Sequence, residues 1–94
     1  DEKSFIQLSN QYDTFLHYGY FRKNEALIII GNTNPNRWYN YLYNIDFIKE
    51  KYGENFKVNQ LFSTRFNEEK PIDIYLNDLT FSPLELKVIH IKKH

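Results

Sequence analysis

Residues 25–34 of the chain, E-A-L-I-I-I-G-N-T-N, decide its fold. Residues 27–30 are an unbroken apolar run rich in β-branched side chains, which favours a strand over a helix. Because the run does not alternate between apolar and polar residues, we expect both faces of this strand to be covered. Gly31 and then Asn34-Pro35 are turn-forming residues and end the strand. The stretch therefore predicts the central strand of a small β domain.

The segments on either side of this strand also carry strand patterns. Residues 14–23 alternate in a period of two and meet the central strand after a short turn, which predicts an antiparallel hairpin. The cleanest alternation lies at residues 39–47, where Tyr39, Tyr41 and Tyr43 share one face. Further strands are expected at residues 56–63, 71–77 and 84–91, with polar turns at residues 64–70 and 78–83. Residues 48–55, which are charged and contain Gly53, form either a loop or a single helical turn.

The two ends of the chain give less regular patterns. Phe5, Leu8 and Tyr12 stand near helical spacing after Ser4, so residues 1–13 form either a short helix or an extended segment. At residues 84–91, apolar Leu84, Leu86 and Val88 alternate with Glu85 and Lys87, which predicts a strand with Leu86 in the core. Ile89 and Ile91 then break the alternation, so we expect the far end of this strand to be covered on both faces. The whole pattern predicts an all-β, antiparallel β-sandwich of about six to eight short strands.

Composition limits the classes of function. The 94 residues fit one domain, residues 1–94, and the absence of methionine leads us to expect a piece excised from a larger protein. Twelve basic residues balance twelve acidic ones, which argues against nucleic acid or a membrane surface as a partner. No apolar run approaches the roughly 20 residues of a membrane span. The chain has no cysteine and only three glycines, so we expect no cofactor and no phosphate-binding loop.

Several segments together resemble a known family. They are E-A-L-I-I-I-G-N-T, then N-Q-L-F-S (59–63), P-I-D-I-Y-L (71–76) and S-P-L-E-L-K-V-I-H-I (82–91). This pattern, over roughly residues 18–91, resembles the C-terminal β-sandwich that follows the catalytic barrel of α-amylase-type glycoside hydrolases. The resemblance implies a non-catalytic accessory domain whose partner is the catalytic domain of the same parent chain. The catalytic acids of that family lie in the barrel, so no catalytic residue is carried over.

The candidate binding residues are the aromatic cluster Trp38, Tyr39, Tyr41 and Tyr43. Flat aromatic rings stack on sugar rings, and neighbouring asparagines such as Asn40 can hydrogen-bond sugar hydroxyls. The simpler interpretation is that the three tyrosines form the core-facing side of a strand, while Trp38 follows a polar loop and is exposed.

Other chemistry has weak support in the sequence. His90 and His94 lie four residues apart at a strand end, and His17 has no nearby carboxylate, so we expect structural histidines and no metal site. The acids Glu68, Glu69, Asp73 and Asp78 fall in turns and on outward faces, where nothing orders them for hydrolysis. The basic residues Arg22, Lys23, Arg37 and Arg65 are scattered among aromatics without the net charge of a single-strand binder.

Three functions follow, each with a distinguishing structural feature. An accessory β-sandwich that stabilises a catalytic domain would have an apolar outer face. A carbohydrate-binding module that takes an oligosaccharide or polysaccharide would expose Trp38 and two coplanar tyrosines. An immunoglobulin-like interaction module would bind through an edge strand.

Overall fold

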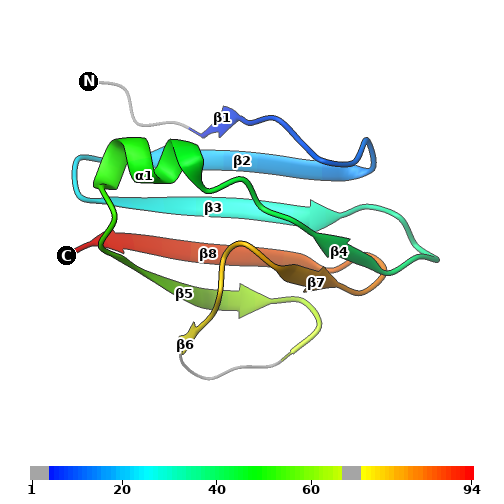
Figure 1. Ribbon diagram of the computed structural model, residues 1–94. Helices are drawn as coiled ribbons and strands as arrows, with labels where there is room; N and C mark the ends of the chain where they lie inside the picture. Colours follow the sequence, from blue (N-terminus) through cyan, green and yellow to red (C-terminus); the bar gives the residue numbers. More distant parts are fainter. Residues whose placement is uncertain (1–4, 67–70) are drawn as a thin grey trace.

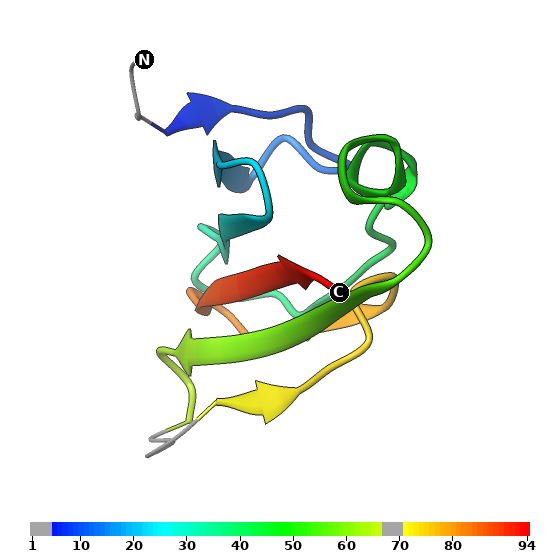
Figure 2. The same cartoon turned by 90° about the vertical axis from the view of Figure 1, so that its left-hand side faces the viewer.

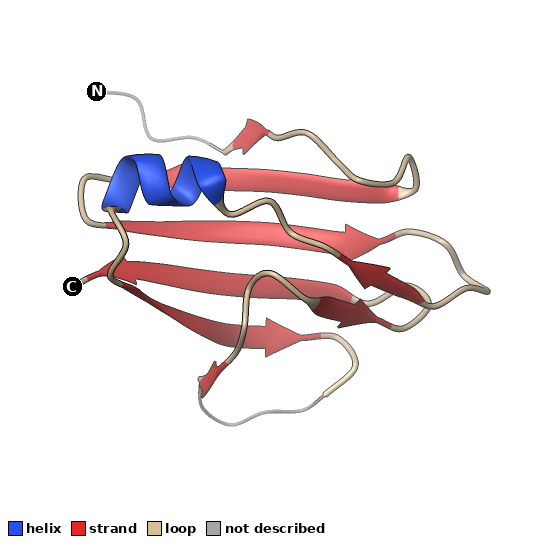
Figure 3. Cartoon of the chain, in the orientation of Figure 1, coloured by secondary structure: helices blue, strands red, loops and turns tan. Residues whose placement is uncertain are grey.

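The computed structural model describes residues 5–66 and 71–94 and contains eight strands and one helix in those ranges. The elements, in chain order, are β1 (Ile6–Gln7), β2 (Phe15–Phe21), β3 (Glu25–Asn32), β4 (Tyr39–Tyr41), α1 (Asp46–Tyr52), β5 (Phe56–Ser63), β6 (Ile72–Asp73), β7 (Leu79–Phe81) and β8 (Leu86–Lys93). The predicted all-β class with six to eight short strands is confirmed (Figure 3).

The strands form two antiparallel sheets. The larger sheet has six strands in the order β1-β2-β3-β8-β5-β6, and the smaller one pairs β4 with β7. β3 lies in the centre of the large sheet, between β2 and β8, and the predicted β2–β3 hairpin is present (Figure 1). The small sheet and α1 lie against one face of the large sheet, which gives a sandwich-like, unclosed arrangement (Figure 2).

The core lies between these two layers. Ile28 and Ile30 of β3 and Ile89 and Ile91 of β8 are fully buried there, together with Phe81 of β7. We call this covered side of the large sheet the inner face. Gly19 of β2 also belongs to it, and an added Cβ at Gly19 would lie only 2.5 Å from the ring of Phe21, so the glycine leaves room for that ring. The remaining buried apolar side chains are Phe15, Ala26, Tyr41, Tyr43, Ile48, Tyr52, Leu76 and Leu79.

The segment after β4 differs from the prediction. The strand expected at residues 39–47 ends at Tyr41, and α1 begins at Asp46 inside it. The helical alternative for residues 48–55 is confirmed, although the helix starts earlier than expected. Ile45, Ile48 and Tyr52 repeat at helical spacing, and the Asn44 side chain accepts a hydrogen bond from the Asp46 backbone N–H at 3.0 Å. These helical signals outweigh the tyrosine alternation. The strand therefore ends with β4 at Tyr41, although Tyr43 is still buried.

The bounds of other elements also differ from the prediction. The first described residues are extended, as β1, so the N-terminal helix is wrong and the extended alternative is confirmed; Ser4 lies outside the described residues. The strand expected at residues 71–77 is only the two-residue β6, and β7 lies within the turn expected at residues 78–83. Leu84, just before β8, has φ +60°, which is a left-handed backbone conformation that leucine rarely adopts.

The start of β8 is inverted relative to the prediction. Glu85 and Lys87 are 1% and 7% exposed, whereas Leu84 is exposed and Leu86 is half-buried. The far end of β8 was expected to be covered on both faces, but only one face is covered. Ile89 and Ile91 are buried on the inner face, where they pair with Ile28 and Ala26 and set the phase of the strand, whereas Val88 and His90 on the other face are only half-buried. Because side chains alternate between the two faces of a strand, Lys87, two residues before Ile89, also points to the inner face.

Hydrogen bonds compensate these buried charges. Lys87 Nζ donates to Glu85 Oε2 at 2.9 Å and to Gln60 Oε1 at 3.2 Å. Glu85 also accepts from the Ser63 hydroxyl at 2.6 Å and from the Ser82 backbone N–H at 2.8 Å. Burial raises the pKa of Glu85, but the bonds from the two serines and the charge of Lys87 outweigh it and lower the pKa overall.

Candidate functional site

The face of the large sheet that points away from α1 carries an apolar surface. Strand pairing aligns Tyr18 of β2 with Ile29 of β3, then Val88 of β8 and Phe62 of β5 in one row across four strands. Tyr18 is 37% and Phe62 50% exposed, and within residues 5–66 and 71–94 no helix or strand packs over this row (Figure 2). We call the surface the outer face; its apolar members are Leu16, Tyr18, Tyr20, Leu27, Ile29, Leu61, Phe62, Leu86 and Val88.

The outer face corrects one sequence prediction. The run at residues 27–30 predicted a strand covered on both faces, yet only Ile28 and Ile30 are buried, and Leu27 and Ile29 are half-buried. A continuous apolar run therefore marks one covered face and one apolar face that no described element covers. Leu61 joins the outer face through a β-bulge between Gln60 and Phe62, which the sequence did not reveal.

One end of the outer face is hollowed and has charged side chains beside its apolar lining. A pocket of about 290 Å³ there is lined mainly by Tyr20, Leu27 and Leu61, with Arg22, Glu25 and His90 at its edge. The His90 Nε2 and Glu25 Oε1 atoms lie 2.8 Å apart, across the β3–β8 pair. This hydrogen bond is the main reason that the pKa of Glu25 is lowered. The surface is thus an apolar strip with a shallow, charged end.

The predicted aromatic cluster is divided between the core and the surface. Tyr41 and Tyr43 are only 3% and 4% exposed, Tyr39 is half-buried, and Trp38 is 53% exposed. The Tyr39 ring packs against Phe15 with centroids 5.3 Å apart. The structure does not bring the four residues together as a flat, exposed platform, and the burial of the tyrosines supports the simpler, core-facing interpretation.

Trp38 has its own neighbour. The guanidinium of Arg65 lies 4.6 Å from the centroid of the Trp38 ring and 4.6 Å from that of Phe66. Both rings are about half exposed. The arginine therefore covers one face of the tryptophan ring.

The remaining sequence candidates are scattered. His17 is buried on the inner face, His90 pairs with Glu25, and in the described part of the chain no three metal-ligating side chains come together. Asp73 is hydrogen-bonded by the Asn59 amide, Asp78 is exposed, and Glu68 and Glu69 lie outside the described residues. Across residues 5–66 and 71–94, no helix has the length and apolar character to cross a membrane.

No protein-family model matches the chain, and neither a curated protein nor a solved structure shows significant similarity to it. The class that the structure defines is a small, sandwich-like all-β fold with one covered sheet face and one apolar face that no element of residues 5–66 and 71–94 covers.

Proposed function

We propose that this domain is a non-catalytic accessory β domain whose outer face packs against a neighbouring domain of the same polypeptide. The observation that carries the proposal is the apolar row Tyr18, Ile29, Val88 and Phe62 on the uncovered side of the sheet. A contiguous apolar surface of this kind marks an interface in a soluble protein. The strand-pattern resemblance to the C-terminal sandwich of α-amylase-type glycoside hydrolases supports a catalytic barrel as that neighbour.

Energetics favour coverage of this face. Each Å² of apolar surface removed from water contributes about 25 cal/mol, so completing the burial of several half-buried side chains is worth several kcal/mol. No Lys, Arg, Asp or Glu side chain belongs to the apolar strip, so its burial leaves no unpaired charge. The charged residues Arg22 and Glu25 stand at one end, where a polar rim of an interface is expected.

The two alternative functions have less structural support. A carbohydrate-binding module with an aromatic platform needs exposed, coplanar rings, and Tyr41 and Tyr43 are buried. An immunoglobulin-like module that binds by strand addition presents an edge strand as its binding element, and the edge strands of the large sheet, β1 and β6, have two residues each. Very short edge strands are a common way of preventing strand addition.

The absence of cysteine allows a direct test by thiol labelling. Tyr18→Cys places one thiol on the outer face, and Glu50→Cys places one on the exposed side of α1, in the opposite layer. Labelling rates are compared between the 94-residue chain and the full product of the reading frame that encodes it. We expect the outer-face thiol to react at least about tenfold more slowly in the full product, with the α1 thiol unchanged.

Two outcomes would overturn the proposal. Equal labelling of the outer-face thiol in both proteins would show that no other domain covers this surface. Protection in the 94-residue chain itself, together with a dimeric mass in solution, would assign the surface to a second copy of the chain. As part of the same proposal, we expect no glycosidase activity from the 94-residue chain alone.

A further inference from the structure

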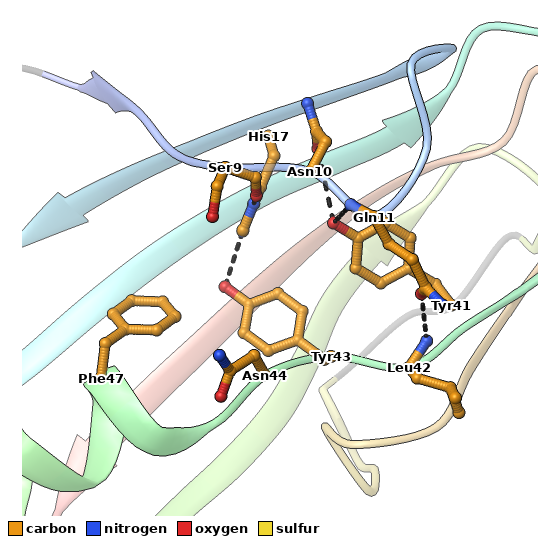
Figure 4. Close-up of a pocket in the computed structure, with 9 residues that line it drawn as sticks. All are labelled: Ser9, Asn10, Gln11, His17, Tyr41, Leu42, Tyr43, Asn44 and Phe47. Atoms are coloured by element: carbon orange, nitrogen blue, oxygen red, sulfur yellow. Dashed lines mark hydrogen bonds between the residues drawn. The ribbon is translucent and has the colours of Figure 1, made fainter.

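A second hollow lies on the other side of the molecule, beside the buried tyrosines. This pocket of about 200 Å³ opens between the segment that precedes β2 and the segment that joins β4 to α1 (Figure 4). Ser9 and Gln11 line it from the first segment, and Tyr43, Asn44 and Phe47 from the second. Its lining includes no Lys, Arg, Asp or Glu. It is thus a polar, uncharged pocket, separate from the outer face.

The floor of the pocket is a defined hydrogen-bonded pair. His17 Nδ1 lies 2.7 Å from the Ser9 carbonyl oxygen, which can only accept, so Nδ1 carries the proton. His17 Nε2 then accepts from the Tyr43 hydroxyl at 2.6 Å. Burial lowers the pKa of His17 and raises that of Tyr43, so both groups are neutral at pH 7. The Tyr43 oxygen still has a lone pair that can accept a hydrogen bond.

Two side-chain amides at the rim have a fixed orientation. The Gln11 Oε1 atom accepts from the Leu42 backbone N–H at 2.7 Å, and Asn44 Oδ1 accepts from the Asp46 backbone N–H. Each oxygen is engaged, so each NH₂ group is held as a donor without a partner among residues 5–66 and 71–94. In Figure 4 the amide nitrogen of Asn44 is turned toward the space between the Phe47 and Tyr43 rings.

We propose that this pocket binds one ring of a neutral, polyhydroxylated ligand, namely a monosaccharide or the terminal unit of a neutral oligosaccharide. Two amide donors, the Tyr43 oxygen and the Ser9 hydroxyl match alcohol groups, which both donate and accept. The half-buried Phe47 ring beside these groups suits one C–H face of a sugar ring. The volume is below the roughly 300–1,000 Å³ of pockets for drug-sized ligands, which fits a single ring.

The absence of charge in the lining selects against other ligands. A carboxylate, phosphate or amine would enter a partly enclosed site with no countercharge and would lose its hydration without compensation. The pocket lies on the side of the inner face, so it stays open when a partner covers the outer face. This inference therefore does not depend on the proposed packing function.

The test is an NMR titration of the 94-residue chain with glucose, galactose, mannose and myo-inositol. Glucuronate and glucosamine serve as the charged counterparts. We expect saturable shifts, in the millimolar range, of the Gln11 and Asn44 side-chain amides with at least one neutral compound, and weaker or no shifts with the charged ones.

Variants separate binding at this pocket from binding elsewhere. Gln11→Glu and Asn44→Asp each keep the oxygen that accepts the backbone N–H but remove the free NH₂ donor. We expect each to weaken binding by roughly three- to tenfold, as loss of one hydrogen bond does. Asn40→Asp is the matched control, because Asn40 is exposed on β4 and uses its side-chain oxygen to accept from the Thr80 hydroxyl; it should bind as the wild type does.

Several results would overturn this inference. They are no saturable shift with any neutral compound, unchanged affinity in both Gln11→Glu and Asn44→Asp, or equal affinity for the charged sugars. Loss of binding in Trp38→Ala would instead place the ligand at the exposed tryptophan. A full set of dispersed backbone signals in each variant shows that it is folded.

Discussion

The two faces of the six-stranded sheet are built from neighbouring residues of the same strands, yet they have different environments. Ile28 and Ile30 of β3 are completely buried under α1 and the small sheet, while Leu27 and Ile29, one position away, stay half-exposed. In this run of β3 both faces carry only leucine or isoleucine. The comparison teaches that an apolar run specifies where apolar surface lies, and only the rest of the chain decides whether that surface is covered.

The largest effect is expected from truncation on the inner face. Ile28→Ala removes a fully buried side chain from the packed layer between the sheets and leaves a cavity. We expect a loss of about 3–5 kcal/mol in the free energy of unfolding, measured by urea denaturation with an unchanged m-value. A loss below about 1 kcal/mol would contradict the assignment of this face to the core.

The next effect comes from the buried ion pair on the same face. Lys87→Met leaves the Glu85 carboxylate buried with only its serine donors. We expect a loss of about 2–3 kcal/mol, because an uncompensated buried charge is costly. Lys92→Met, at an exposed position of the same strand, is the matched control and should change stability by less than about 0.5 kcal/mol. Equal stability of the two variants would show that the pair contributes nothing.

A smaller effect is expected on the outer face. Ile29→Ala truncates a side chain that is already half in water, so we expect a loss of about 1 kcal/mol in the 94-residue chain. In the full product of the reading frame the same change should cost more, because the proposed partner would bury the rest of the side chain. Unfolding followed by tryptophan fluorescence gives both values. A cost equal to that of Ile28→Ala would mean that the two faces do not differ.

The positions of β2, β3, β5 and β8 were predictable because period-two alternation and turn residues are local signals. The central strand, the hairpin before it and the all-β class all follow from them. The phase of β8 was not predictable, because Leu86 and Ile89 satisfy opposite faces and only the pairing of Ile89 with Ile28 chooses between them. Glu85 and Lys87 are acceptable inside only because Ser63, distant in sequence, lies beside them.

The candidate site was predictable only in part. The alternation of Tyr39, Tyr41 and Tyr43 correctly indicated a core-facing side, but the same alternation, extended to residue 47, concealed where α1 begins. The helical spacing of Ile45 and Ile48 after Asn44 was the signal that could have revealed it. The outer face and the pocket beside Tyr43 depend on contacts between distant segments, which no local pattern encodes.

The smallest expected effect concerns pH and the one histidine of the inner face. Burial lowers the pKa of His17 from its ordinary value of 6.5, although its bond to Ser9 opposes the shift. The unfolded chain therefore takes up a proton at higher pH than the folded chain does. The stability contribution of neutral His17 is complete above about pH 6.5, declines as pH falls toward the lower folded pKa, and is constant below it.

We expect the free energy of unfolding to fall less steeply between pH 7 and 5 in His17→Gln than in the wild type, with His94→Gln as the control that removes an exposed imidazole. Parallel curves for the wild type and His17→Gln would contradict the burial of a neutral imidazole, and with it the floor of the proposed sugar pocket.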